Sequence, residues 1–219
     1  MAGLLFTSQE WGNFGFGLGE PEDQVSLRRA SLATSIHSER LVFMRQTHSA
    51  VIQVVDGTDP IVEADGILTT QRGISLAVLV GDCIPLLLAS DSVIGALHVG
   101  RVGMQREIVK NALVKMVALG AKEIDAIIGP SICGHCYEVA PDMYQEVVAQ
   151  IPETATSKDL HCLDLQAGVA SQLRSHGKDV VRKVTNVNLC TAENALYFSH
   201  RKSQSENRNA GRQVGVITL

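Results

Sequence analysis

Two histidines and one cysteine, His48, Cys83 and His98, each lie beside a short apolar run. The runs have the length and composition of β-strands, so one end of a sheet could bring the three side chains together. Two imidazoles and one thiolate that leave a fourth position open form a known type of catalytic zinc site. Their spacing is not a metal motif by itself, and a cysteine in an apolar run or a histidine beside a glycine is commonly a core or turn residue. The pattern alone leaves both interpretations open.

Cys83 also permits chemistry without a metal. An imidazole from His48 or His98 could activate its thiol as a nucleophile while Asp82 orients the base, as in a cysteine hydrolase or deamidase. In the zinc interpretation, Asp82 is the first choice for a carboxylate that carries a proton, or it orients one of the histidines. The catalytic candidates are therefore Asp82, Cys83 and His98.

Cys133 and Cys136 form a second candidate for chemistry. Two cysteines separated by two residues are typical of half a structural zinc site or of a redox pair. The sequence contains no second pair with this spacing. We therefore interpret both as turn and core residues, and we interpret Cys162 and Cys190 in the same way.

The elements that must position the three candidate ligands are predicted between residues 74 and 104. Residues 76–80, 84–89 and 93–97 are short runs rich in Val, Ile and Leu, typical of strands buried on both faces. Asp82 and Cys83 interrupt the first two runs, and His98 follows the third. Polar groups at strand ends are where α/β sheets usually place binding and catalytic groups.

The rest of the chain predicts alternating helices and strands without a repeat or linker, so we expect one domain over residues 1–219. Residues 11–20, with four glycines, predict an irregular loop. Apolar periodicity predicts helices at 23–36, 106–119, 141–151 and 164–175. Strands are predicted at 41–44 and 51–55, joined by a turn, and at 125–129, 180–187 and 213–219. A turn is predicted at 63–66, and a helical turn at 193–198.

The composition argues against some partners. The net charge of −4 disfavours nucleic acid, because binding a phosphate backbone needs a concentrated basic surface. The N-terminal residues lack the basic start and apolar length of a secretory signal, and no apolar run approaches a membrane span. We therefore expect a cytoplasmic protein, in which the five cysteines are thiols, metal ligands or core residues.

Several short motifs occur in the order, and at about the spacing, of the YfiH family, also called the DUF152, laccase-domain or polyphenol oxidase family. The resemblance covers residues 12–219 and includes a Gly81–Pro85 segment, a Leu97–Gly100 segment and a Tyr197–Arg201 segment. The other matching motifs are Gln46-Thr47-His48, Ala64-Asp65-Gly66, Gly129-Pro130-Ser131-Ile132, Cys136-Tyr137-Glu138-Val139 and Cys190-Thr191.

The resemblance implies a single YfiH-like domain, an α/β (α+β) sandwich with a mixed β-sheet and flanking helices. It implies that His48, Cys83 and His98 bind a catalytic zinc ion. It also implies phosphorolysis of adenosine, inosine, guanosine and methylthioadenosine to the free base and ribose 1-phosphate, and hydrolytic deamination of adenosine. The expected partners are thus purine nucleosides and phosphate.

Four further residues are candidates for substrate binding. Arg45, Arg101 and Arg201 could bind phosphate because a guanidinium group offers two parallel donors, although each could also be an ordinary surface charge. Asn13 could contact the base or the ribose, or it could support a turn.

The sequence departs from the family pattern directly after His98. The family usually has His-Ala-Gly-Trp-Arg-Gly where this chain has Arg101 and Val102 at the Trp and Arg positions. Arg101 could replace the usual arginine from the neighbouring position, or the chain could be a degenerate scaffold without activity. The family's older name also points to copper and laccase-like oxidation, but a laccase needs several copper centres, and too few histidines lie at strand ends to build them.

Overall fold

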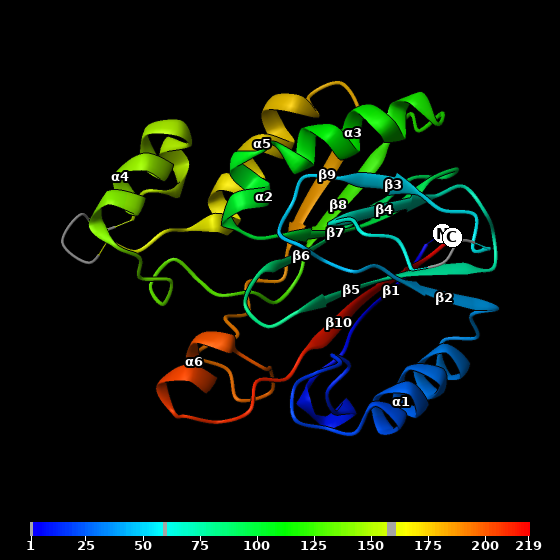
Figure 1. The fold of residues 1–219 in the computed structure, drawn as a ribbon. Helices are drawn as coiled ribbons and strands as arrows, with labels where there is room; N and C mark the ends of the chain where they lie inside the picture. Colours follow the sequence, from blue (N-terminus) through cyan, green and yellow to red (C-terminus); the bar gives the residue numbers. More distant parts are fainter. Residues whose placement is uncertain (1, 59–60, 157–160) are drawn as a thin grey trace.

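The computed structural model describes residues 2–58, 61–156 and 161–219. Two β-sheets pack face to face, and helices cover their outer faces (Figure 1). The predicted mixed α/β sandwich with flanking helices is confirmed, with two mixed sheets in place of one.

The four-stranded sheet joins the two ends of the described chain. Its order is β1 (Gly3–Phe6), β10 (Gln213–Thr218), β5 (Ile74–Val80) and β2 (Arg40–Phe43). β10 pairs antiparallel with both neighbours, while β2 runs parallel to β5. Helix α1 (Glu22–Ser35) covers the outer face, where its Leu32 packs with Ala77 and Val214.

The six-stranded sheet carries the most buried strands. Its order is β3 (Ile52–Val54), β4 (Gly66–Thr69), β7 (Ile94–Val99), β6 (Ile84–Ala89), β8 (Ile124–Ile128) and β9 (Val181–Asn186). The inner strands pair antiparallel, and the strands at both edges pair parallel with their neighbours. Helices α2 (Arg101–Gln105), α3 (Ile108–Ala118) and α5 (Leu165–His176) pack on its outer face.

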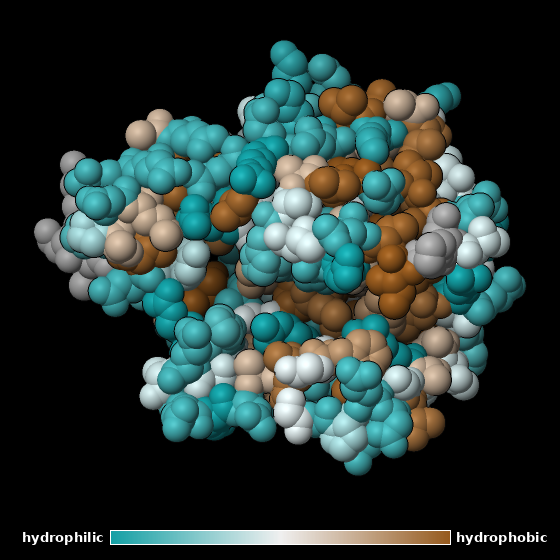
Figure 2. All heavy atoms as spheres, viewed as in Figure 1, coloured by the Kyte–Doolittle hydropathy of each residue, from teal (hydrophilic) through white to brown (hydrophobic). Residues whose placement is uncertain are grey.

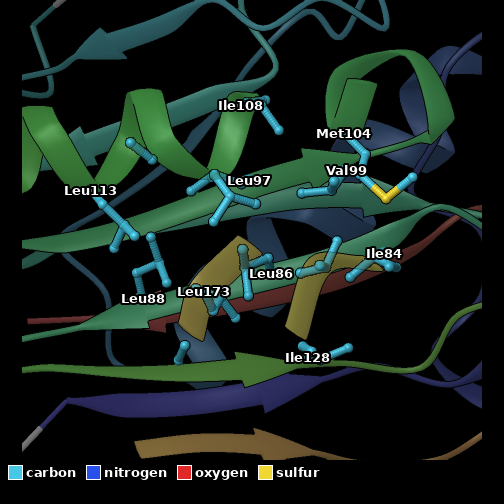
Figure 3. Close-up of a cluster of buried hydrophobic side chains, with 14 of the residues drawn as sticks. Ile84, Leu86, Leu88, Leu97, Val99, Met104, Ile108, Leu113, Ile128 and Leu173 are labelled. Atoms are coloured by element: carbon cyan, nitrogen blue, oxygen red, sulfur yellow. The ribbon is translucent and has the colours of Figure 1, made fainter. Parts of the chain in front are cut away.

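Strand alternation divides the core into layers. Leu86 and Leu88 of β6 point toward the helices, where Figure 3 shows them beside Leu113 and Leu173. Leu87, between them, faces the other sheet. Because side chains on a strand alternate between faces, β7 places Leu97 on the helix side and its neighbour His98 toward the space between the sheets.

Two differences from the sequence prediction have local causes. The helix expected at 106–119 is α3, and a short helix that was not expected, α2, precedes it; Glu107 separates the two because it adopts a left-handed conformation with φ of 59°. The strands expected as one strand-turn-strand unit, now β2 and β3, belong to different sheets because each finds its own parallel partner.

The other helices lie toward the ends of the sheets. These are α4 (Pro141–Gln150), which begins with a proline as predicted, and α6 (His200–Ser205), with short 3₁₀ turns at Gln9–Trp11 and Pro152–Thr154. The pattern did not predict α2, α6, β1 or β4. Across the described ranges, no helix combines the length and apolar character needed to cross a membrane.

Candidate metal centre and active site

A buried carboxylate, Asp65, shapes the loop that presents the first candidate ligand. The backbone N–H groups of Thr47, His48 and Ser49 all donate to its carboxylate, at 3.1, 3.0 and 2.6 Å. His48 has a φ of 58°, and successive N–H groups in such a turn form a concave site for an anion. Asp65 also accepts a 2.7 Å hydrogen bond from His98 Nδ1, so one side chain positions both histidines.

Cys83 lies where the chain crosses from one sheet to the other. β5 ends at Val80 and β6 begins at Ile84, so residues 81–83 make the whole connection between the sheets. Asp82 has a φ of 127°, a strained conformation for a residue other than glycine. Its carboxylate accepts hydrogen bonds from Thr191 Oγ1 at 2.6 Å and from the Arg201 backbone N–H at 2.7 Å, which hold this turn in place.

The structure brings His48, Cys83 and His98 together between the two sheets, whereas the sequence suggested one end of a single sheet. Their nearest ligand atoms all lie within 4.8 Å of one another, and Cys83 Sγ is 3.9 Å from His48 Nε2. Nitrogen and sulfur ligands of a tetrahedral zinc ion are about 3.6 Å apart. Because Asp65 accepts from His98 Nδ1, the Nε2 atom of His98 remains available as a ligand. The donor set and its geometry therefore fit a metal ion.

The electrostatics of the triad favour a thiolate. Burial would raise the pKa of the Cys83 thiol, but the charges and hydrogen bonds of His98 and His48 outweigh burial and lower it to about 6. Burial would likewise lower the pKa of His98, but Cys83 and Asp65 raise it to about 9. A thiolate is the form that binds metals and attacks electrophiles.

The triad opens into a cavity of about 740 Å³. Figure 2 shows hydrophobic residues in the recess between the part that carries α6 and α1 and the part that carries α2. The lining includes one acidic residue, Asp82, and five arginines, Arg29, Arg45, Arg101, Arg201 and Arg212. An apolar cavity of this size with an excess of guanidinium groups suits a small anionic ligand.

The three arginines predicted from the sequence all line this cavity. Arg101 donates from Nη1 to Gln105 at 2.7 Å, and Arg201 donates from Nη2 to a backbone carbonyl at 2.8 Å. Both lie near Tyr137: burial raises the pKa of its phenol, and the two arginines oppose that shift. Arg45 is more exposed and forms an ion pair with Glu63.

The structure bears on the alternatives that the sequence left open for Asn13 and Asp82. Asn13 is buried, and its amide holds the glycine-rich loop: Oδ1 accepts from the Gly15 and Arg212 N–H groups, and Nδ2 donates to the Gly15 carbonyl. It does not line the cavity, so the structure supports the turn role. Asp82 lines the cavity, but the carboxylate that orients a histidine is Asp65.

The role of Asp65 was not predicted from the sequence. The available signal was an acidic residue next to glycine just before an apolar run, which a β-turn would explain equally well. Arg29 and Arg212, which line the cavity from α1 and from the start of β10, were not predicted either.

The fold and the site define a two-sheet α/β protein with two histidines and a cysteine between its sheets that could hold a metal ion. Residues 6–219 match the model of the family described as multi-copper polyphenol oxidoreductase laccase. The chain belongs to this family, which is also called YfiH or DUF152.

Relatives and solved structures agree with this assignment. Proteins named purine nucleoside phosphorylase from Streptomyces coelicolor and Corynebacterium glutamicum are 38% and 37% identical, and the matches cover 91% and 94% of this chain and 86% of each relative. The structure of YlmD from Geobacillus stearothermophilus matches with a TM-score of 0.83 and 24% identity over 99% of this chain and 91% of that one. A DUF152 protein from Neisseria meningitidis matches with a TM-score of 0.81 and 21% identity, and the match covers 100% of this chain and 90% of that one. The two structures support the fold.

Proposed function

We propose that this chain is a zinc-dependent purine nucleoside phosphorylase that also deaminates adenosine. The substrates are adenosine, inosine, guanosine and methylthioadenosine, and the phosphorolysis products are the free base and ribose 1-phosphate. The observation that carries the proposal is the His48, Cys83 and His98 triad at the wall of an arginine-lined cavity. The names of the relatives supply the substrate class. A cytoplasmic location is part of the same proposal.

The triad would offer three ligands to a zinc ion, and all three residues line the cavity, from which water or substrate could reach the ion as in catalytic zinc sites. When bound, zinc supplies a Lewis acid that polarises an oxygen atom of water or substrate. The protein's part is to keep the ligands in place: Asp65 fixes the ring of His98 and the loop of His48. Laccase-like oxidation by copper would need more metal sites than these residues provide, because a laccase uses several copper centres. Among the described residues, two groups could hold a metal, and only one of them contains histidine.

The arginines suit the phosphorolysis step. A phosphate oxygen bonds to C1′ of the ribose while the bond from C1′ to the purine nitrogen breaks, and the electron pair leaves with the base, which takes up a proton. Arg101 and Arg201 flank Tyr137 on one side of the cavity and would hold the phosphate through charge-assisted hydrogen bonds. Phe16 is 40% exposed and lines the same cavity, where its ring can stack on a purine.

Deamination would use the same metal centre with water as the nucleophile at C6 of adenine. The amino group leaves as ammonia, so a proton must pass from the water to the leaving nitrogen. Asp82 was the first candidate carrier, but its carboxylate is engaged with Thr191 and the Arg201 N–H. Each carboxylate oxygen keeps a further lone pair, so these bonds fix the orientation of Asp82 and leave it able to take up a proton.

A metal-free cysteine hydrolase is the alternative that one observation favours, namely the pKa of Cys83 near 6 beside two histidines. Metal content and chelation separate the two functions. A zinc enzyme loses activity to a chelator and regains it with zinc, whereas a cysteine hydrolase is unaffected by chelation and is inactivated by alkylation of Cys83.

The first test is chromatography of adenosine after incubation with the purified protein. Adenine and ribose 1-phosphate should appear only when phosphate is present, and inosine should appear with or without it. Arg101→Ala should raise the KM for phosphate about 10- to 100-fold, since a hydrogen bond to a charged group contributes about 1.5–3 kcal/mol. Arg72→Ala, on an exposed turn outside the cavity, is the matched control.

Cys83→Ala tests the ligand assignment. It should remove one zinc ion per chain and abolish both reactions, because two histidines alone bind zinc weakly. An unchanged zinc content in Cys83→Ala would refute the assignment. Unaltered nucleosides after long incubation with zinc-loaded protein would favour the degenerate scaffold.

A further inference from the structure

A second group of sulfur ligands lies outside the cavity of the proposed active site. Cys133 and Cys136 follow β8, and Cys190 and Glu193 follow β9. Their three sulfur atoms and a carboxylate oxygen all lie within 4.8 Å of one another. Four ligands around a zinc ion, with sulfur at about 2.3 Å from the metal, are about 3.8 Å apart. The four donors therefore lie close to the positions that a tetrahedral ion requires.

Backbone hydrogen bonds hold these donors in place independently of any metal. The Ser131 N–H donates to the Leu189 carbonyl, and the Thr191 N–H donates back to the Ser131 carbonyl, both at 3.1 Å. The Cys136 N–H donates to the Cys133 carbonyl at 3.1 Å, which closes a tight turn between the two cysteines. The fold therefore arranges the site in advance.

Short contacts already join the members of the cluster. The Cys133 N–H donates to Cys190 Sγ at 3.3 Å, and Cys136 Sγ lies 3.5 Å from Glu193 Oε1. A divalent cation would replace the thiol protons and hold the four donors together.

We propose that Cys133, Cys136, Cys190 and Glu193 form a second metal site that binds zinc. Thiolate ligands select zinc among the common divalent ions, and four protein ligands without an open position are typical of a structural site. The cluster borders a separate cavity of about 540 Å³, which gives a path for the ion.

Such an ion would join two segments that shape the active-site cavity. The first segment carries Ile132 and Tyr137, which line that cavity. The second carries Thr191, which donates to Asp82 in the crossover turn. The second metal would thus stiffen one wall of the active site without contacting substrate. This proposal does not depend on the reaction proposed above.

The test is zinc counting on the full chain, purified without chelator or added metal. The wild type should hold about two zinc ions per chain, and Cys136→Ser, Cys190→Ser and Cys83→Ser should each hold about one. Cys162→Ser is the matched control: Cys162 borders the same cavity, yet its sulfur is not part of the cluster. It should keep both ions.

Cobalt(II) gives a second readout in the Cys83→Ser variant, which retains only the proposed second site. Cobalt should produce a strong near-ultraviolet absorption from thiolate ligands. Glu193→Gln, a change at an exposed position, should keep this absorption but weaken cobalt binding about 10-fold, because three thiolates remain. Because Glu193→Gln leaves the three cysteines of the cluster unchanged, it tests the site even if Cys136→Ser or Cys190→Ser does not fold.

Three results would overturn the proposal. One is wild-type protein with about one zinc ion that is lost in Cys83→Ser. Another is the absence of thiolate absorption when cobalt is added to Cys83→Ser. The third is a disulfide among Cys133, Cys136 and Cys190 in protein kept under reductant, which would identify a redox group in place of a metal site.

Discussion

Substitution of Asp65 by asparagine separates the positioning of the metal ligands from the ligands themselves. The side chain is fully buried and accepts hydrogen bonds from Thr47, His48, Ser49 and His98. Asparagine has nearly the same shape but only one acceptor oxygen, and its NH₂ group is a donor. In either orientation of the amide, its NH₂ group would therefore point at N–H groups that now donate to a carboxylate oxygen of Asp65.

Each orientation damages one ligand. If the NH₂ group replaces Oδ2, the N–H groups of Thr47 and Ser49 lose their acceptor, and the loop that carries His48 loosens. If it replaces Oδ1, it faces Nδ1 of His98, which must then accept, so the proton moves to Nε2 and blocks the ligand atom. Zinc affinity should fall about 10- to 100-fold either way, the usual effect of removing a partner of a ligating histidine.

The variant should also be less stable by about 3–5 kcal/mol, the usual cost of breaking a buried ion pair. A protein of this size then melts about 10 °C lower and still folds at room temperature. Zinc affinity is measured by competition with a chelating dye in a Cys136→Ser background, so that only the triad contributes. Asp125→Asn, which removes a half-buried carboxylate paired with Arg182, is the control. If Asp65→Asn binds zinc as tightly as the wild type, Asp65 does not position the ligands.

Three further variants test other parts of the structure. Gly100→Ala should weaken zinc binding with little change in Tm, because its Cβ would lie 3.1 Å from Cys83 Sγ, whereas Gly3→Ala, with 3.9 Å to its nearest neighbour, should change neither. Arg29→Lys should lower the stability by about 1–2 kcal/mol in thermal unfolding, because lysine cannot stack between two phenylalanine rings as the guanidinium group does at 4.2 and 4.0 Å. Asp125→Asn should cost less than about 1 kcal/mol near neutral pH. Arg182 on β9 lowers the pKa of the Asp125 carboxyl in the folded state. The ion pair therefore contributes its full stabilisation above the ordinary carboxyl pKa, and this stabilisation disappears as the pH falls through the pKa of the folded state. The Tm values of variant and wild type should therefore converge in acid.

Local patterns in the sequence predicted the elements but not their partners. Residues 84–89 predict a buried strand because six consecutive residues without charge are not typical of a solvated surface. The structure confirms this prediction, since β6 has these bounds. Nothing local shows that the chain changes sheets between Val80 and Ile84, because strand pairing depends on distant segments. The same limit explains the cysteines: the pair at Cys133 and Cys136 lacked a matching pair in the sequence, and only folding brings Cys190 to it.

The crossover also explains why the triad forms only in the complete fold. Cys83 lies in the connection between the sheets, His98 belongs to the six-stranded sheet, and His48 lies in the segment from β2 of one sheet to β3 of the other. No single sheet can hold all three ligands. A bound metal ion must therefore stabilise the packing of one sheet on the other, since only the folded state brings the ligands together. Zinc should slow the exchange of amide hydrogens in β5 and β6, whose ends meet at this site, more than in α4, which lies to the side of both sheets (Figure 1).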